Sequence, residues 1–118
     1  MTSEITPFGK IFISKRAIAT IAYQAALRSY GIVGLTSKNI VEGLANILVK
    51  DPMRGVDVHY DGNKIDIDLY VIVEYGTRIK SVAVSVANTV RYQVEKKLGL
   101  PINKINVHVQ ELRVSDFD

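Results

Sequence analysis

The segment from Lys64 to Gly76 carries the clearest alternation of apolar and polar residues in the chain. One set of alternate positions is entirely aliphatic, with Ile65, Ile67, Leu69, Val71 and Val73. This period of two is typical of a β-strand with one face on a hydrophobic core. The other set begins with Asp66 and Asp68 and becomes apolar at Tyr70 and Ile72. The second half of the strand is therefore predicted to be covered on both faces.

Weaker patterns predict the elements that precede this strand. Residues 9–14 alternate and predict a first strand. Residues 15–30 repeat apolar side chains every three or four positions, which predicts a helix capped by Ser14 and ended by Gly31. Residues 32–35 predict a short strand or a tight connection, and residues 39–50 predict a second helix that the Asp-Pro pair at 51–52 ends.

A hairpin is predicted around the turn sequence Asp61-Gly62-Asn63. Residues 55–60 alternate and form its first strand. If Tyr60 pairs with Ile65, His59 lies opposite Asp66, and Asp57 lies opposite Asp68. All four of these polar side chains are then on the outward face of the sheet.

The remainder of the chain predicts a third helix and a last strand. Residues 77–98 have a helical apolar period, and Gly99 ends the helix. The last strand places Ile105, Val107 and Val109 inward, and its pattern slips at Glu111, which predicts a bulge or a sheet edge. The element order strand–helix–strand–helix–strand–strand–helix–strand predicts an α+β fold, a mixed sheet with helices on one face.

Composition agrees with one folded domain over residues 1–118, with a core of about 8–114 and short polar tails. The chain is 47% hydrophobic and contains no cysteine. Its longest apolar run, 69–73, is far shorter than the roughly 20 residues that span a bilayer. Residues 1–8 have no secretory signal pattern, so we expect a cytoplasmic protein without a membrane span.

Charge is unevenly distributed, although the formal net charge is only +3. The strands of the predicted hairpin are acidic, while the first and third predicted helices are basic. Basic helices are compatible with a small nucleic-acid-binding module, which is the alternative function. The clamp loop of KH domains and paired exposed strand aromatics are absent from the sequence, so nucleic acid is not the expected partner.

No sequence motif for catalysis or for phosphate binding is present. His59, His108, Asp57, Asp66 and Asp68 have the side-chain types that bind divalent metals, but a solvated strand face with cross-strand His–Asp pairs is the favoured explanation. No nucleophile in a recognisable motif accompanies the His–Asp pair. We therefore expect no enzymatic activity, no cofactor and no metal.

The predicted partner-binding residues are Tyr70, Ile72, Tyr92, Asp66 and Asp68. The apolar pair Tyr70 and Ile72 needs a cover on the outward face of the sheet. Two alternatives remain open, since either the second helix or a loop covers the pair, or another subunit does.

An ordered series of short motifs resembles a known family. The series includes G-K-I-F-I-S at 9–14, G-I-V-G at 31–34, I-D-I-D-L-Y-V-I-V-x-Y-G at 65–76 and G-L-P-I-N-K-I-N-V-H-V at 99–109. It is similar to the alkaline-shock, Gls24-like envelope stress response proteins of Gram-positive-type bacteria, and to their small YloU-like members. The resemblance covers roughly residues 7–114.

This resemblance implies a small cytoplasmic α/β protein without known enzymatic activity. It also implies self-association, or a position at the inner face of the cell membrane through a membrane-anchored partner. Together with the residues, it leads to the hypothesis of a non-enzymatic interaction or scaffold protein. The partner would be a second copy of the chain, forming a homo-oligomer, or a membrane-anchored protein.

Overall fold

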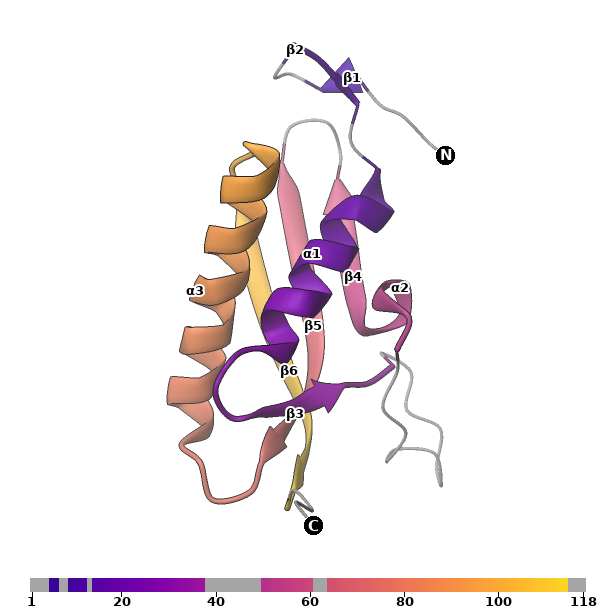
Figure 1. Ribbon diagram of the computed structural model, residues 1–118. Coiled ribbons are helices and arrows are strands. Elements are labelled where there is room, and N and C mark those ends of the chain that lie inside the picture. Colours follow the sequence, from indigo (N-terminus) through magenta and orange to yellow (C-terminus); the bar gives the residue numbers. More distant parts are fainter. Residues whose placement is uncertain (1–4, 7–8, 13, 38–49, 61–63, 115–118) are drawn as a thin grey trace.

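The computed structural model describes residues 5–6, 9–12, 14–37, 50–60 and 64–114 (Figure 1). Three helices occur in this part, α1 (Lys15–Leu27), α2 (Pro52–Gly55) and α3 (Ile79–Leu98). The strands are β1 (Ile5–Thr6), β2 (Gly9–Phe12), β3 (Ile32–Leu35), β4 (Val56–Tyr60), β5 (Ile65–Glu74) and β6 (Lys104–Arg113). The predicted α+β class is confirmed.

Strand β5 is the centre of the main sheet. Strand β6 pairs with it in parallel along almost its whole length. On the other edge, β4 pairs with the first half of β5 and β3 pairs with the second half, both antiparallel. The sheet is therefore mixed, as predicted, and β5 has a neighbouring strand on both sides.

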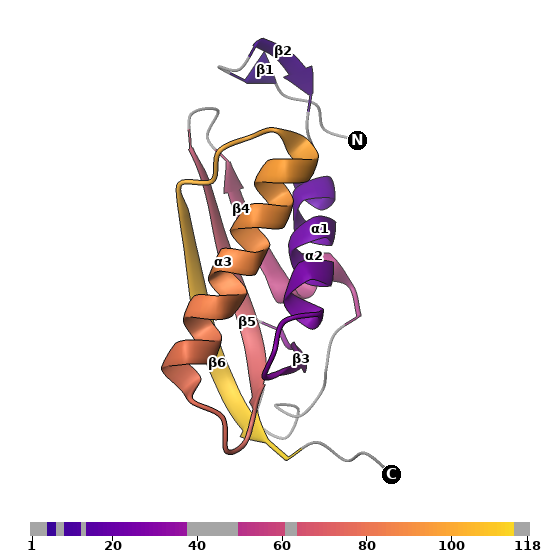
Figure 2. The same ribbon diagram turned by 60° about the vertical axis from the view of Figure 1, so that its left-hand side comes forward.

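Helices α1 and α3 cover one face of this sheet (Figures 1 and 2). The inward residues of β5 form one buried cluster with the apolar stripes of both helices. On α1 the stripe consists of Ile18 and four alanines, Ala19, Ala22, Ala25 and Ala26. On α3 it consists of Val82, Val86, Val90 and Val94, spaced four residues apart. Small alanine side chains let α1 pack closely, while valines fill the space under α3.

The ends of both long helices follow from local chemistry. The Ser14 hydroxyl accepts a hydrogen bond from the Ala17 backbone N–H at 3.0 Å, which caps α1. Gly99 ends α3 in the left-handed conformation with φ of 69°. The third predicted helix begins two residues late, because Thr77 forms a turn with Glu74 and α3 starts only at Ile79.

The predicted hairpin is confirmed residue by residue. Tyr60 pairs with Ile65, His59 with Asp66 and Asp57 with Asp68. The predicted slip near Glu111 is also confirmed. Val71 pairs with Val109 while Ile72 pairs with Glu111, so one residue of β6 bulges between them.

Two expectations at the N-terminal half need correction. The predicted first strand at 9–14 does not join the main sheet, because β2 pairs with β1 in a separate two-stranded sheet. The Asp-Pro pair at 51–52 does not simply end a helix. Asp51 Oδ1 accepts a hydrogen bond from the Met53 N–H, and this cap starts the short helix α2. Most of the predicted helix at 39–50 lies outside the described residues.

Candidate functional site

The outward face of the sheet, opposite α1 and α3, carries a polar cluster centred on Asp68. Asp68 lies on the central strand β5, with Asp57 of β4 directly opposite on one side and Asn106 of β6 on the other. His59 and His108 lie diagonally from it on the same two strands. The hairpin register and the parallel pairing of β6 together bring these five side chains onto one patch.

The Asp68 carboxylate is the acceptor on which the cluster converges. The His59 Nε2 atom lies 3.1 Å from Oδ2, and the His108 Nε2 atom lies 3.0 Å from Oδ1. The Asn106 amide donates to Oδ1 at 3.0 Å. The Asp68 side chain is only 16% exposed, so these polar neighbours replace much of its water.

Opposing influences act on the Asp68 pKa. Burial is the largest, and it raises the pKa because it disfavours the charged form. The hydrogen bonds from His108 and Asn106, and the charges of His108 and His59, together outweigh burial. The pKa of Asp68 is therefore lowered from its ordinary value of 3.8.

Like charges meet across the hairpin where Asp57 lies opposite Asp68. Such a pair is destabilising unless a cation lies between the two groups. His59 lies between the two groups, with its Nε2 atom 3.1 Å from Asp68 and 4.0 Å from Asp57. One imidazole thus links both carboxylates.

Two asparagines on and before β6 belong to this patch, although the sequence reasoning did not include them. Asn103 donates its side-chain amide to Asp66 at 2.8 Å, as Asn106 does to Asp68. Only the register between β5 and β6 places them, and no local motif predicts that register.

The apolar part of the outward face is buried within the single chain. Ile72 is 0% exposed and Tyr70 is 8% exposed, and neither belongs to the core beneath the helices. Tyr70 stacks on His108, with ring centroids 4.7 Å apart. The described neighbours of Ile72 across the sheet are Gly34 and Glu111.

The burial of Tyr70 and Ile72 is evidence on the two alternatives for what covers them, which were a segment of the same chain or another subunit. The chain itself covers Tyr70 and Ile72, so a second subunit is not needed to bury them. Helices α1 and α3 are not the cover, since they pack on the other face. Partner binding by Tyr70 and Ile72 stays a prediction, and it requires both side chains to be uncovered.

Tyr92 is not brought together with the other predicted partner-binding residues. It lies on α3, on the helical side of the sheet, and is 58% exposed. The Lys96 ammonium lies 5.4 Å from the centre of its ring, a cation–π arrangement. Asp66 and Asp68, by contrast, share the outward patch of the sheet.

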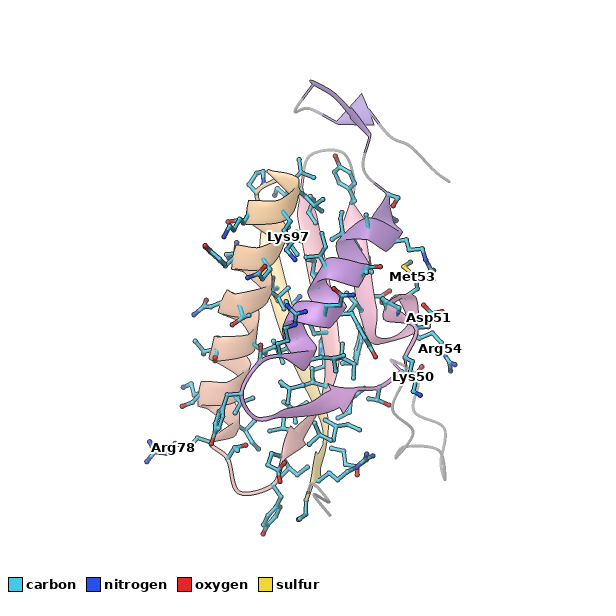
Figure 3. All side chains as sticks on the ribbon, viewed as in Figure 1. Lys50, Asp51, Met53, Arg54, Arg78 and Lys97 are labelled. Carbon is cyan, nitrogen blue, oxygen red and sulfur yellow. The ribbon has the colours of Figure 1, made fainter. Side chains whose placement is uncertain are left out.

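Charge separates between the two sides of the molecule. The outward face of the sheet holds the acidic residues Asp57, Asp66, Asp68, Glu74 and Glu111, named here the acidic face. Two bases of β6 share this face, Lys104 opposite Asp66 and Arg113 opposite Glu74, so the acids outnumber them by five to two. Helices α1 and α3 with their caps hold one acid, Glu95, and eight basic residues, named here the basic face: Lys15, Arg16, Arg28, Arg78, Lys80, Arg91, Lys96 and Lys97. Figure 3 shows Lys97 beside the gap between α3 and α1 and Arg78 at the opposite end of α3.

The geometry of the outward patch does not favour a metal centre. Among the residues that the structure describes, no group of three or more His, Cys, Asp or Glu side chains is arranged to hold a metal ion. Instead, the two imidazoles are both engaged with the Asp68 carboxylate. None of the helices in the described ranges combines the length and apolar character needed to cross a bilayer.

Comparison with solved structures shows that the fold is known. The C-terminal domain of MamM in a copper form has a TM-score of 0.53 at 17% sequence identity, over 88% of this chain and 92% of that chain. Its M250L variant has a TM-score of 0.51 at 21% identity, over 82% and 95% of the two chains. At such low identity the likeness concerns the fold alone.

Comparison of sequences shows the family. An uncharacterised protein of Bacillus subtilis, YloU, is 46% identical over 113 residues, which is 94% of each chain. An uncharacterised protein of Streptococcus pyogenes, Spy1614, is 32% identical over 117 residues, or 97% of each chain. Residues 3–114 match the model of the alkaline-shock, Gls24-like family, which is described as having a cell envelope-related function. The predicted resemblance is thereby confirmed, and the chain belongs to this alkaline-shock protein family.

Proposed function

We propose that this protein is a non-enzymatic interaction protein that assembles with copies of itself at the cell envelope. The acidic face of one copy contacts the basic face of the next. The observation that carries the proposal is the division of charge between the two sides of the sheet. Because the two complementary surfaces lie on opposite sides of one molecule, their contact is head-to-tail and can continue from copy to copy.

The polar cluster supports a binding role better than a catalytic one. Within the described residues, the hydrogen-bond partners of the Asp68 side chain are two imidazoles and one amide. No hydroxyl or thiol nucleophile takes part in this described network, although nucleophilic catalysis would require one. Asp57, beside this cluster, has a side chain that is 37% exposed, and its carboxylate is suited to contact with cations of a partner.

The location that fits this role is the cytoplasm, at the inner face of the membrane, through a membrane-anchored partner. The family description supports an envelope-related role. Cell fractionation tests the location, since a peripheral protein held by charge is released from membranes by a high-salt wash. Recovery only in the soluble fraction at low salt would argue against the membrane partner.

Sedimentation velocity tests the head-to-tail contact. We expect the average mass to rise with concentration at about 50 mM salt and to fall at about 500 mM, because added salt shortens the range of charge–charge attraction. Reversing two charges of the basic face, with Arg28→Glu and Lys97→Glu, should abolish the growth. The control is Lys50→Glu, a charge on the opposite side of the molecule from α3 (Figure 3).

A mixing experiment separates charge complementarity from loss of folding. A chain with Asp57→Lys and Glu111→Lys retains its basic face, while the Arg28→Glu and Lys97→Glu chain retains its acidic face. Neither should grow head-to-tail alone, but the two should associate with each other in equal amounts, since each still supplies one of the two surfaces. Failure of the mixture to associate, with both chains folded by circular dichroism, would count against the head-to-tail contact.

The nucleic-acid alternative draws on the same basic face. A filter-binding titration with single- and double-stranded DNA at several salt concentrations separates it from protein association. Affinity that falls steeply with salt would support nucleic-acid binding. We expect no retention, because the described helices carry their basic side chains on a helical surface rather than in a groove with stacking aromatics.

A further inference from the structure

Strand β6 has a neighbouring strand on one side only in the described part of the chain. It pairs with β5, and Figure 2 shows the first part of β6 at the left-hand edge of the sheet. The strand is ten residues long and contains no proline. Alternate residues of such an edge direct their backbone N–H and C=O groups outward, where another strand can pair with them.

A groove runs beside this free edge, between β6 and α3. Its volume is about 440 Å³. Small or apolar side chains form most of its walls, with Ala83, Val84 and Ala87 on α3 and Ile105 and Val107 on β6. Val84 is 56% exposed, which is unusual for a valine in the middle of a long helix. The two alanines leave the apolar row of β6 incompletely covered by its own helix.

A second copy of the chain is the occupant that fits both walls of the groove. When two β6 strands pair antiparallel about a two-fold axis, residues on one face meet residues of the same face. The apolar row of one copy then continues into the apolar row of the other. The same axis brings α3 beside its counterpart, where small residues permit close approach. An isolated peptide strand could form backbone hydrogen bonds with the edge of β6. It would not bring a helix to pack against Val84.

The register of this pairing follows from the side chains. When the two-fold axis passes at Val107, this residue lies opposite Val107 of the second copy. Ile105 then lies opposite the second copy's Val109. Asn106 then lies opposite His108, and Lys104 opposite Gln110, so no like charges meet. An axis at Asn106 would lose one apolar pair and would place Lys104 opposite His108, where a protonated imidazole would be repelled.

We propose that two copies of this protein form a two-fold dimer through antiparallel pairing of β6, with the axis at Val107 and the α3 helices packed side by side. The dimer joins two sheets into one continuous sheet. It rests on the proposed function in that it specifies a self-contact, but apart from Lys80, which also belongs to the basic face, it uses different residues from the head-to-tail contact. Backbone pairing and apolar burial hold it, and Lys80, one turn before Val84, adds like charge near the axis. Salt therefore does not weaken this dimer.

Cysteine cross-linking tests the register directly, because the chain contains no cysteine of its own. In the proposed dimer a Val107→Cys chain should form an intermolecular disulfide on mild oxidation, since opposed residues have Cβ atoms about 4.5–5.5 Å apart. The matched control is Ile105→Cys, on the same face of the same strand, whose two copies would lie too far apart to cross-link. Equal cross-linking of both variants, or of neither, would overturn the register.

Sedimentation at about 500 mM salt, where head-to-tail contacts are screened, tests the dimer itself. We expect a dimer for the natural chain and at least an approximately tenfold weaker dimer for Val84→Lys. The control is Leu27→Lys on α1, a residue that is 41% exposed and does not line the groove. A monomer at high salt overturns the dimer whatever happens at low salt. A dimer at high salt without growth at low salt overturns only the head-to-tail contact.

Discussion

At the scale of single residues, the acidic face is organised by the partners of one carboxylate. Asp68 faces a second carboxylate, Asp57, yet it stays ionised more readily than an ordinary aspartate because its pKa is lowered. The reason is the set of donors around it, two imidazoles and the Asn106 amide, whose combined effect exceeds the effect of burial. The cluster therefore couples β4, β5 and β6 through one side chain.

Substitution of Asp68 by asparagine should reveal this coupling as a pH-dependent loss of stability. At pH 7 we expect the free energy of unfolding to fall by about 1–2 kcal/mol, because hydrogen bonds to a charged acceptor are lost. The folded-state pKa lies below the ordinary 3.8, so the stabilisation is present above that value and is lost as pH falls through the folded-state pKa. Urea unfolding from pH 7 down to pH 3 measures the difference.

The control for this prediction is Asp66→Asn, on the same strand and the same face. The Asp66 side chain accepts one hydrogen bond from the Asn103 amide, and asparagine can keep that bond. Its effect on the free energy of unfolding at pH 7 should be smaller. A difference between Asp68→Asn and the natural chain that is constant from pH 7 to pH 3 would show that the charge of Asp68 is not the stabilising feature.

At the scale of elements, the connection between α1 and β3 depends on a glycine. Gly31 has φ of 84°, a conformation that side chains with a Cβ rarely adopt. A Cβ built there would lie 2.6 Å from Val82 Cγ2 on α3. The glycine therefore serves two purposes, since it allows the turn and lets this connection pack against the third helix.

Alanine at Gly31 should destabilise the protein more than alanine at Gly76. Gly76 also has a positive φ, of 95°, but no atom lies within 4 Å of a built Cβ. We expect about 1–2 kcal/mol for Gly76→Ala from backbone strain alone. Gly31→Ala should cost about 1–3 kcal/mol more, from overlap with Val82. Urea unfolding of both variants measures this, and equal losses would show that the contact with Val82 relaxes freely.

Elements whose limits are encoded locally were predictable from the sequence. The alternation of residues 55–60 and 65–69 on either side of the sequence Asp-Gly-Asn predicted the hairpin register, and the slip in apolar period at Glu111 predicted the bulge in β6. Helix α2 was missed because Asp51-Pro52 was interpreted as a stop. Aspartate before proline is also a helix-start signal, with the side chain as cap and proline in the first turn.

Features that depend on distant segments were not predictable. No local motif determines how β6 lies against β5, so the approach of Asn106 and His108 to Asp68 could not be placed with certainty. The burial of Ile72 likewise depends on distant segments of the chain. Its apolar character predicted a cover, but whether the cover came from the same chain depended on the whole fold.

At the scale of the whole molecule, the two proposed self-contacts lie on different surfaces. The head-to-tail contact uses the two faces of the sheet layer, while the two-fold contact uses one edge of the sheet. One is governed by charge and the other by backbone pairing and apolar burial. A molecule with both contacts assembles through dimers that then join to one another, because the two-fold contact covers the edge of the sheet and one side of α3 and leaves the acidic face and the α1 part of the basic face available.

This arrangement predicts a stepwise response of the assembly to salt. At about 500 mM salt the protein should stop at dimers, and at about 50 mM the dimers should grow further with concentration, because only the charged contact is screened. Val84→Lys should remove the dimer at high salt but still permit growth at low salt. The Arg28→Glu and Lys97→Glu chain should do the reverse and remain a dimer at both. Multi-angle light scattering of the three chains at both salts measures these masses, and a single variant that abolished both steps while folded would show that the two contacts share one surface.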